Sequence, residues 1–107
     1  MVIQGVSRSK HIVNEGSKAV AVTSTVVSEE VFGAKRVNLA LTNVSGGGET
    51  ITLAFGQEAV AGRGIRLGDG DTYITSADAG YTPSQQRVHA IGSAAATIAI
   101  HEELILD

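Results

Sequence analysis

The chain carries three histidines, His11, His89 and His101, and these are the side chains best suited to metal binding or proton transfer. None of them has a second histidine at the spacing that places two ligands on one helical turn. His89 and His101 alternate out of two predicted strands, residues 86–91 and 96–102, and could share a zinc ion if these strands paired. Because no third ligand lies nearby in the sequence, the pattern favours ordinary surface or half-buried histidines, with zinc binding as the alternative.

The run Gly68-Asp69-Gly70-Asp71 places two carboxylates two residues apart, a spacing that could bind calcium. It lacks the twelve-residue loop and terminal glutamate of an EF-hand. It also occurs once, whereas calcium-binding β-roll repeats stack several copies. We therefore predict a tight turn in which glycine supplies positive φ angles and aspartate caps the backbone.

The other motifs that often carry catalysis or cofactor binding are incomplete. The glycine clusters at 46–48 and 62–64 precede no helix, which a phosphate-binding loop requires. The carboxylate pairs at 29–30 and 102–103 are adjacent, so on a strand they point to opposite sides. No serine lies in a nucleophile elbow, and the absence of cysteine removes thiolate nucleophiles and disulfides. We expect a protein that is not an enzyme and uses no cofactor and no metal.

Two alternating runs, residues 36–44 and 51–56, show which elements would position these side chains. In the first run Val37, Leu39 and Leu41 share one face. A glycine-rich segment joins the two runs, so we predict a β-hairpin with one face in the core.

The rest of the chain repeats this pattern. Residues 18–27 form a β-branched run, and 65–67 and 72–75 are short strand candidates. Residues 86–91 and 96–102 form a predicted closing pair. A length of 107 residues, thirteen glycines and a single proline fit one domain of short strands and tight turns. We predict an all-β fold, a single antiparallel β-sandwich with jelly-roll-like character. Its predicted core is Val20, Val22, Val37, Leu39, Leu41, Ile51, Leu53, Phe55, Val88, Ile98 and Ile100.

The N-terminal region differs from the rest in charge. Residues 1–20 carry three basic side chains and Glu15, a net charge of +2, whereas the remaining residues sum to −5 and the whole chain to −3. Apolar residues are sparse before a turn signal at 14–17. We therefore predict an extended N-terminal arm over residues 1–17 and a β-sandwich domain over residues 18–107. The arm either pairs with a neighbouring copy or is a solvated tail.

The weak net negative charge argues against nonspecific binding to nucleic acid. No apolar stretch has the length of a signal peptide or a membrane span, so we expect a soluble, unexported chain with no membrane partner.

Three adjacent aliphatic residues at positions 104–106 cannot all face one core if the chain is extended. Either residues 1–13 cover the outer side of this last strand, or another subunit does. Since residues 18–102 suffice to close a small core, we predict that the aliphatic and basic residues outside that span contact other copies or a larger particle. These interface candidates are Val2, Ile3, Val6, Arg8, Lys10, Ile12, Val13, Leu104, Ile105 and Leu106.

The order of several short motifs resembles small β-sandwich virion proteins of tailed bacteriophages, of the head decoration, cement or head-fibre type. A strand opened by Arg36 ends in Thr42-Asn43-Val44-Ser45, and the next ends in Phe55-Gly56. Gly64-Ile65-Arg66-Leu67-Gly68-Asp69-Gly70 follows, and Val88 to Glu102 forms the closing pair. Asp69 replaces the proline usual before the glycine of this turn.

The resemblance implies a capsid decoration or cement protein that binds and stabilises the head shell. Its partners would be the major capsid protein or other virion proteins, and the chain would form a homo-oligomer. It would be made in the host cytoplasm and lie on the capsid surface of the virion. The alternative is a tail, connector or fibre-tip component that binds host glycans, although Tyr73 and Tyr81 alone offer rings for sugar stacking.

Overall fold

The computed structural model describes residues 11–30, 32–77, 80 and 83–106, and within them the chain forms eight β-strands. The strands are β1 (His11–Val20), β2 (Thr25–Ser28), β3 (Ala34–Asn43), β4 (Ile51–Phe55), β5 (Ile65–Leu67), β6 (Thr72–Ser76), β7 (Val88–Gly92) and β8 (Ala96–Leu106).

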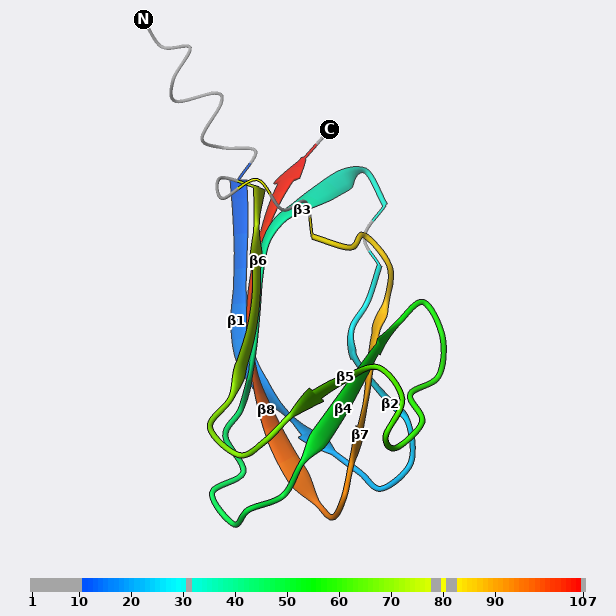
Figure 1. Cartoon of the computed structure of the whole chain (residues 1–107). Helices are drawn as coiled ribbons and strands as arrows, with labels where there is room; N and C mark the ends of the chain where they lie inside the picture. Colours follow the sequence, from blue (N-terminus) through cyan, green and yellow to red (C-terminus); the bar gives the residue numbers. More distant parts are fainter. Residues whose placement is uncertain (1–10, 31, 78–79, 81–82, 107) are drawn as a thin grey trace, which may run out of the picture.

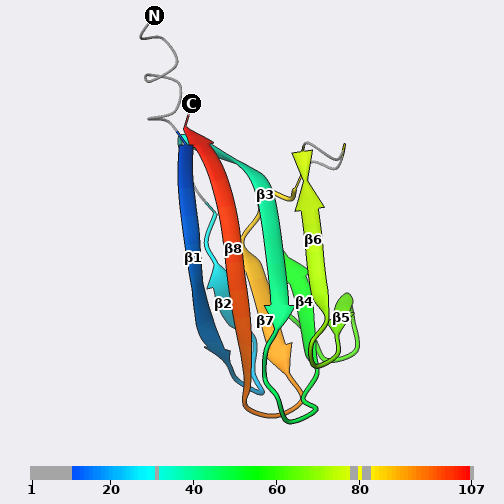
Figure 2. The ribbon, with the colours of Figure 1, turned by 90° about the vertical axis from the view of Figure 1, so that its left-hand side faces the viewer.

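The strands form two packed antiparallel sheets, which confirms the predicted all-β sandwich (Figure 1). One sheet has the order β1-β8-β3-β6 and the other the order β2-β7-β4-β5. The neighbouring pairs β1 with β8, β2 with β7, β3 with β6 and β4 with β5 are those of a long antiparallel ribbon rolled up on itself. This arrangement is the jelly roll. Figure 2 shows the first sheet face-on, with β1 at one edge and β6 at the other.

The prediction of two β-hairpins is wrong. β3 and β4 belong to different sheets, so the glycine-rich segment between them crosses the sandwich instead of closing a hairpin. The predicted closing pair, β7 and β8, is split between the sheets in the same way. The alternating pattern fixes which face of a strand is buried, but it carries no information about which strand lies beside it.

The core consists of the side chains that point inward from the strands of both sheets. Leu39 and Leu41 of one sheet pack with Ile51, Leu53 and Val88 of the other in one buried cluster, as predicted. That cluster also contains buried residues that the prediction omitted, namely Val27, Leu67, Ala90 and Ala96. Phe55 and Ile100 are partly buried against it.

Two residues of the predicted core lie elsewhere. Val22 is 61% exposed, because β1 ends at Val20 and the chain turns before β2 begins. Val37 is only half-buried, because the pairing of β3 with β8 shifts register between Arg36 and Asn38. Such a bulge inserts an extra residue, so the alternation of inward and outward side chains shifts by one residue at Val37.

The predicted boundary at residue 17 also differs from the structure. Residues 11–17 belong to β1, which pairs with β8 without interruption from His11 opposite Ile105 to Val20 opposite Ala96. The sandwich therefore includes part of the expected arm. Residues 1–10 lie outside the described residues.

The Gly-Asp-Gly-Asp run forms the turn between β5 and β6, as predicted. Gly70 has a φ of 89°, and the Asp71 carboxylate accepts a hydrogen bond from the Gly68 N–H at 2.9 Å. Asp69 accepts hydrogen bonds from the N–H groups of Gly46 and Gly48, each at 2.9 Å, and these bonds lower the pKa of its carboxyl group. Asp71 therefore stabilises its own turn, and Asp69 joins this turn to the glycine-rich loop between β3 and β4.

Candidate interaction site along strand β1

The inner face of strand β1 is the most unusual feature of the sandwich. Residues that oppose each other in an antiparallel pair point to the same side of the sheet. On β8 the side chains of Leu104, Glu102, Ile98 and Ala96 are buried between the sheets, so their partners on β1 also face inward. These partners are Ile12, Asn14, Lys18 and Val20, and Gly16 shares their phase opposite Ile100.

Val20 alone among these five inward positions is buried. Ile12, Asn14, Gly16 and Lys18, which we call the β1 inner face, remain exposed although they point toward the second sheet. The second sheet offers little to cover them, because β2 at its near edge is only four residues long. The two sheets are thus left open along this side.

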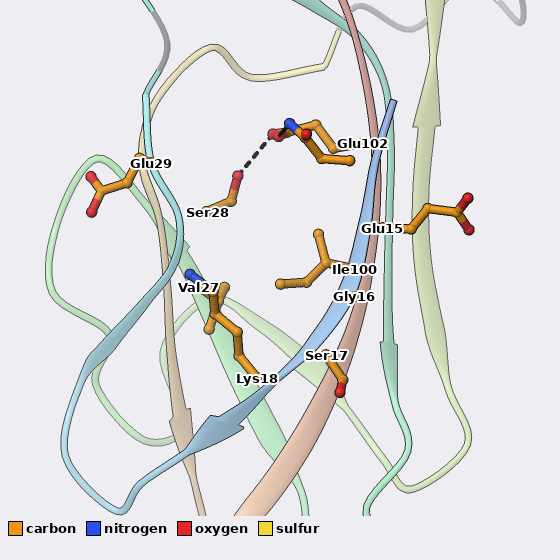
Figure 3. A pocket seen from close by; sticks show the side chains of 10 residues that line it. Glu15, Gly16, Ser17, Lys18, Val27, Ser28, Glu29, Ile100 and Glu102 are labelled. Carbon is orange, nitrogen blue, oxygen red and sulfur yellow. Dashed lines mark hydrogen bonds between the residues drawn. The ribbon is translucent and has the colours of Figure 1, made fainter. Parts of the chain in front are cut away.

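A cavity of about 300 Å³ occupies this opening. Asn14, Gly16 and Lys18 line it from β1, and Val27 and Ser28 face them from β2. Figure 3 shows Ile100 and Glu102 at its back, with Glu15 and Glu29 directed away from it on either rim. A β-carbon added at Gly16 would meet no atom within 4 Å, so the missing side chain contributes directly to the open space.

Glu102 on β8, which lines the cavity, forms a buried ion pair with Arg36 on β3. The Arg36 Nε donates to Glu102 Oε2 at 2.7 Å, and their side chains are 2% and 7% exposed. Ser28 donates to the same carboxylate oxygen at 2.8 Å, and Asn14 donates to the other at 3.1 Å. The carboxylate therefore links β8 to the three strands β1, β2 and β3.

The remaining guanidinium donors of Arg36 are also satisfied. One terminal nitrogen donates to the carbonyls of Ser84 and Gln86, and the other to Ser28 Oγ and the Glu29 carbonyl. A guanidinium has five N–H groups, and each has an acceptor here. Because these acceptors come from the side of the second sheet, Arg36 braces the two sheets against each other.

The charge of Glu102 is stabilised despite its burial. Burial raises the pKa of its carboxyl group, but the hydrogen bonds from Ser28, Arg36 and Asn14 outweigh this effect, and the pKa falls below its ordinary value. The carboxylate is thus held ionised as the partner of Arg36.

On the outer face of the same sheet, two histidines and two glutamates join β1 to β8. Glu103 contacts His101 Nε2 at 2.8 Å and His11 Nε2 at 3.1 Å, while Glu15 lies 3.4 Å from His101 Nδ1. The hydrogen bond to Glu103 raises the pKa of His101, against a smaller effect of desolvation. The same bond, with one from Asn38, lowers the pKa of Glu103. We call these four titratable residues the outer cluster.

The zinc alternative for His89 and His101 is contradicted by the topology. His89 lies on β7 and His101 on β8, in different sheets, and each neighbours buried residues that point inward. The two imidazoles therefore occupy opposite outer faces of the sandwich. In the described part of the chain, no group of three or more His, Cys, Asp or Glu side chains could hold a metal ion.

The structure places the predicted interface residues in different environments, some buried and some exposed. Leu104 is 3% exposed and belongs to the interior, whereas Ile105 is exposed because successive strand residues alternate sides. Leu106 shares the phase of Leu104 but is exposed at the last position of β8. Ile12 and Val13 are exposed on β1. The predicted residues Val2, Ile3, Val6, Arg8 and Lys10 lie outside the described residues.

Sequence reasoning missed the residues that line the cavity, above all Asn14, Gly16 and Lys18. Asn14 and Gly16 were assigned to the N-terminal arm because of the turn signal at 14–17, and Lys18 was assigned to a strand without any indication of the cavity. The one available sign was their common phase with Val20, which is visible only once residues 11–20 are known to be extended.

No family model and no curated protein matches this sequence. A solved structure described as "Bacillus endospore appendages form a novel family of disulfide-linked pili" is similar in fold, with a TM-score of 0.58 and 15% sequence identity. The match covers 91% of this chain and 88% of the other. Within the described residues, no helix is long and apolar enough to cross a membrane.

Proposed function

We propose that this chain is a non-enzymatic structural subunit that assembles with further copies of itself into a larger particle. The observation that carries the proposal is the β1 inner face, where four positions directed into a sandwich remain uncovered. Inward positions of a sandwich are ordinarily buried against the opposite sheet. A second chain would complete this side of the molecule.

The position of β1 supports the proposal. Among the described strands β1 is an edge strand of ten residues, and no other described strand pairs with its outer side, which leaves that side for pairing with another chain. Proteins that remain monomeric usually blunt such edges, and proteins that assemble use them for strand addition.

The buried charges also favour a structural role. Arg36 and Glu102 carry charges in the interior of the sandwich. The hydrogen-bonding groups of both side chains have partners within the chain itself. A catalytic acid or base needs a lone pair or proton directed toward a substrate. The arrangement instead suits a rigid building block.

The similarity in fold to a structure of Bacillus endospore appendages also supports assembly, because those appendages are pili. Those pili are disulfide-linked, whereas this chain has no cysteine, so its copies would associate through noncovalent contacts.

The narrower form of the proposal is decoration of a tailed-phage head, and it rests on the order of motifs between Arg36 and Glu102. In that form the major capsid protein or other virion proteins are partners. The alternative form, a filament or tail component, is favoured by the similarity in fold to a pilus structure. Neither form requires a cofactor.

Analytical ultracentrifugation of the purified chain over a hundredfold range of concentration tests self-assembly. Concentration-dependent oligomers support the proposal, and a monomer throughout contradicts it. Quantitative mass spectrometry of parent particles then separates the narrower forms: a copy number near that of the major capsid protein indicates decoration, and a few copies indicate a tail or connector.

A further inference from the structure

The cavity beside Gly16 has aliphatic walls that suit the side chains of an extended peptide. Val27 and Ile100 line it together with Lys18, while the carboxylates of Glu15 and Glu29 at its rims are directed away from it and pair with His101 and Arg87. Peptides that add to a sheet edge use main-chain hydrogen bonds for affinity and pockets for alternate side chains for specificity. β1 offers both an edge and a pocket.

Residues 1–10 of the chain have the matching sequence. They contain the aliphatic residues Val2, Ile3 and Val6, followed by the bases Arg8 and Lys10, and they contain no acidic residue. In an extended chain alternate side chains share a face, so Val2, Val6 and Arg8 would point the same way. The two valines would then enter the cavity, and Arg8 would lie on the same face beyond them.

Chain direction favours a second copy as the source of this segment. β1 runs from His11 toward Val20, so the preceding residues leave at the end remote from Gly16. Gly5 is the only glycine or proline among residues 1–10. To reach the cavity, residues 2–8 of the same molecule would have to reverse their direction. A segment from another molecule needs no reversal.

We propose that the cavity lined by Gly16, Val27 and Ile100 receives residues 2–8 of a second copy. This inference rests on the self-assembly proposed above. Each copy then donates one segment and accepts another, a head-to-tail contact that generates open chains or rings.

Two complementary variants of the full chain test the proposal. Gly16→Leu directs a side chain into the cavity, because the added β-carbon meets no atom within 4 Å and Gly16 does not adopt a positive φ. This variant can donate its segment but cannot accept one. Deletion of residues 1–10 leaves all of β1 in place and gives a chain that can accept but cannot donate. Gly16→Ala, which leaves most of the space open, is the matched control.

Sedimentation velocity should show each of the first two variants as a monomer, and Gly16→Leu should melt at or above the temperature of the natural chain. An equimolar mixture of the two should form a 1:1 dimer and nothing longer, while Gly16→Ala assembles like the natural chain. A synthetic peptide of residues 1–10 in tenfold excess should dissociate assemblies of the natural chain, which provides a readout independent of any variant.

Several results would overturn the inference. If Gly16→Leu assembles like the natural chain, the cavity is not the contact. If it blocks assembly but the deletion does not, another segment of the second copy occupies the cavity. If the mixture stays monomeric and the peptide has no effect, residues 1–10 are not the ligand. In all these cases self-assembly still stands, whereas a natural chain that is monomeric at every concentration removes both proposals.

Discussion

Arg36 and Glu102 lie 66 residues apart in the sequence and form a buried 2.7 Å ion pair on neighbouring strands of one sheet, with no donor of the guanidinium and no oxygen of the carboxylate left without a partner. Burying two charges costs several kcal/mol, which an ion pair recovers only with good geometry and additional hydrogen bonds. Both conditions are met here. The pair is therefore expected to be sensitive to the loss of either member.

Glu102→Leu should lower the free energy of unfolding by about 3–5 kcal/mol, because it leaves a buried guanidinium without its counter-charge. Urea denaturation measures the loss. The double variant Arg36→Met/Glu102→Leu should lose less than Glu102→Leu alone. As a surface comparison, Glu29→Gln breaks the exposed pair with Arg87 and should cost no more than about 1 kcal/mol. A small loss for Glu102→Leu would show that the pair is dispensable.

The outer cluster should make stability depend on pH. The pKa of His101 is raised above 6.5 in the folded state, so its contribution is complete below the unfolded pKa and is lost as pH rises through the folded pKa. The pKa of Glu103 is lowered below 4.5, so its contribution is lost as pH falls. His11 and Glu15 from β1 face the same group. The melting temperature should therefore decrease from mildly acidic toward alkaline pH.

His101→Gln should flatten the alkaline part of this profile, measured by thermal melts from pH 5 to pH 9. His89→Gln, on the outer face of the other sheet, should retain the dependence because the outer cluster is intact. An identical pH profile for His101→Gln and the natural chain would show that the cluster does not couple protonation to folding.

Leu53→Ala should destabilise the fold by about 2–5 kcal/mol, because the side chain is 1% exposed at the centre of the core cluster. Chemical denaturation of the purified variant gives the value. Val60→Ala, at an exposed position, is the comparison and should change stability by about 0.5 kcal/mol or less. A Leu53 variant that behaves like the Val60 variant would contradict the described core.

Gly64→Ala should be clearly more destabilising than Gly62→Ala. Both glycines have positive φ angles, 116° and 80°, so each alanine introduces backbone strain. At Gly64 the new β-carbon would also lie 2.4 Å from the Leu53 carbonyl oxygen, whereas at Gly62 it meets nothing within 4 Å. The difference between the two melting temperatures isolates the steric contact with β4, and equal losses would exclude it.

Calcium should not stabilise the protein. The carboxylates of Asp69 and Asp71 already accept backbone hydrogen bonds within and between loops. A ligand that binds only the folded state raises the melting temperature, so thermal melts with calcium and with chelator should coincide. An increase of several degrees with calcium would make the loop a binding site, and Asp69→Asn would then abolish the increase.

The sequence by itself determined the fold class and much of the core. The period-two alternation of Leu39 and Leu41, and of Ile51 and Leu53, indicates buried strand faces because side-chain direction along a strand is a local property. The turn at Asp69–Asp71 was predictable for the same reason, since its glycines and side-chain acceptors act over a few residues.

The tertiary structure alone decided which strands are neighbours and what the interior holds. A strand's pattern does not encode its partner, so β3 and β4 looked like a hairpin although they lie in opposite sheets. The sequence did not indicate that Arg36 and Glu102 pair, and the packing of the sheets encloses them together. The β1 inner face arises because pairing with β8 directs Asn14, Gly16 and Lys18 inward where the short β2 cannot cover them. Whether an inward side chain is covered depends on contacts between segments far apart in the chain.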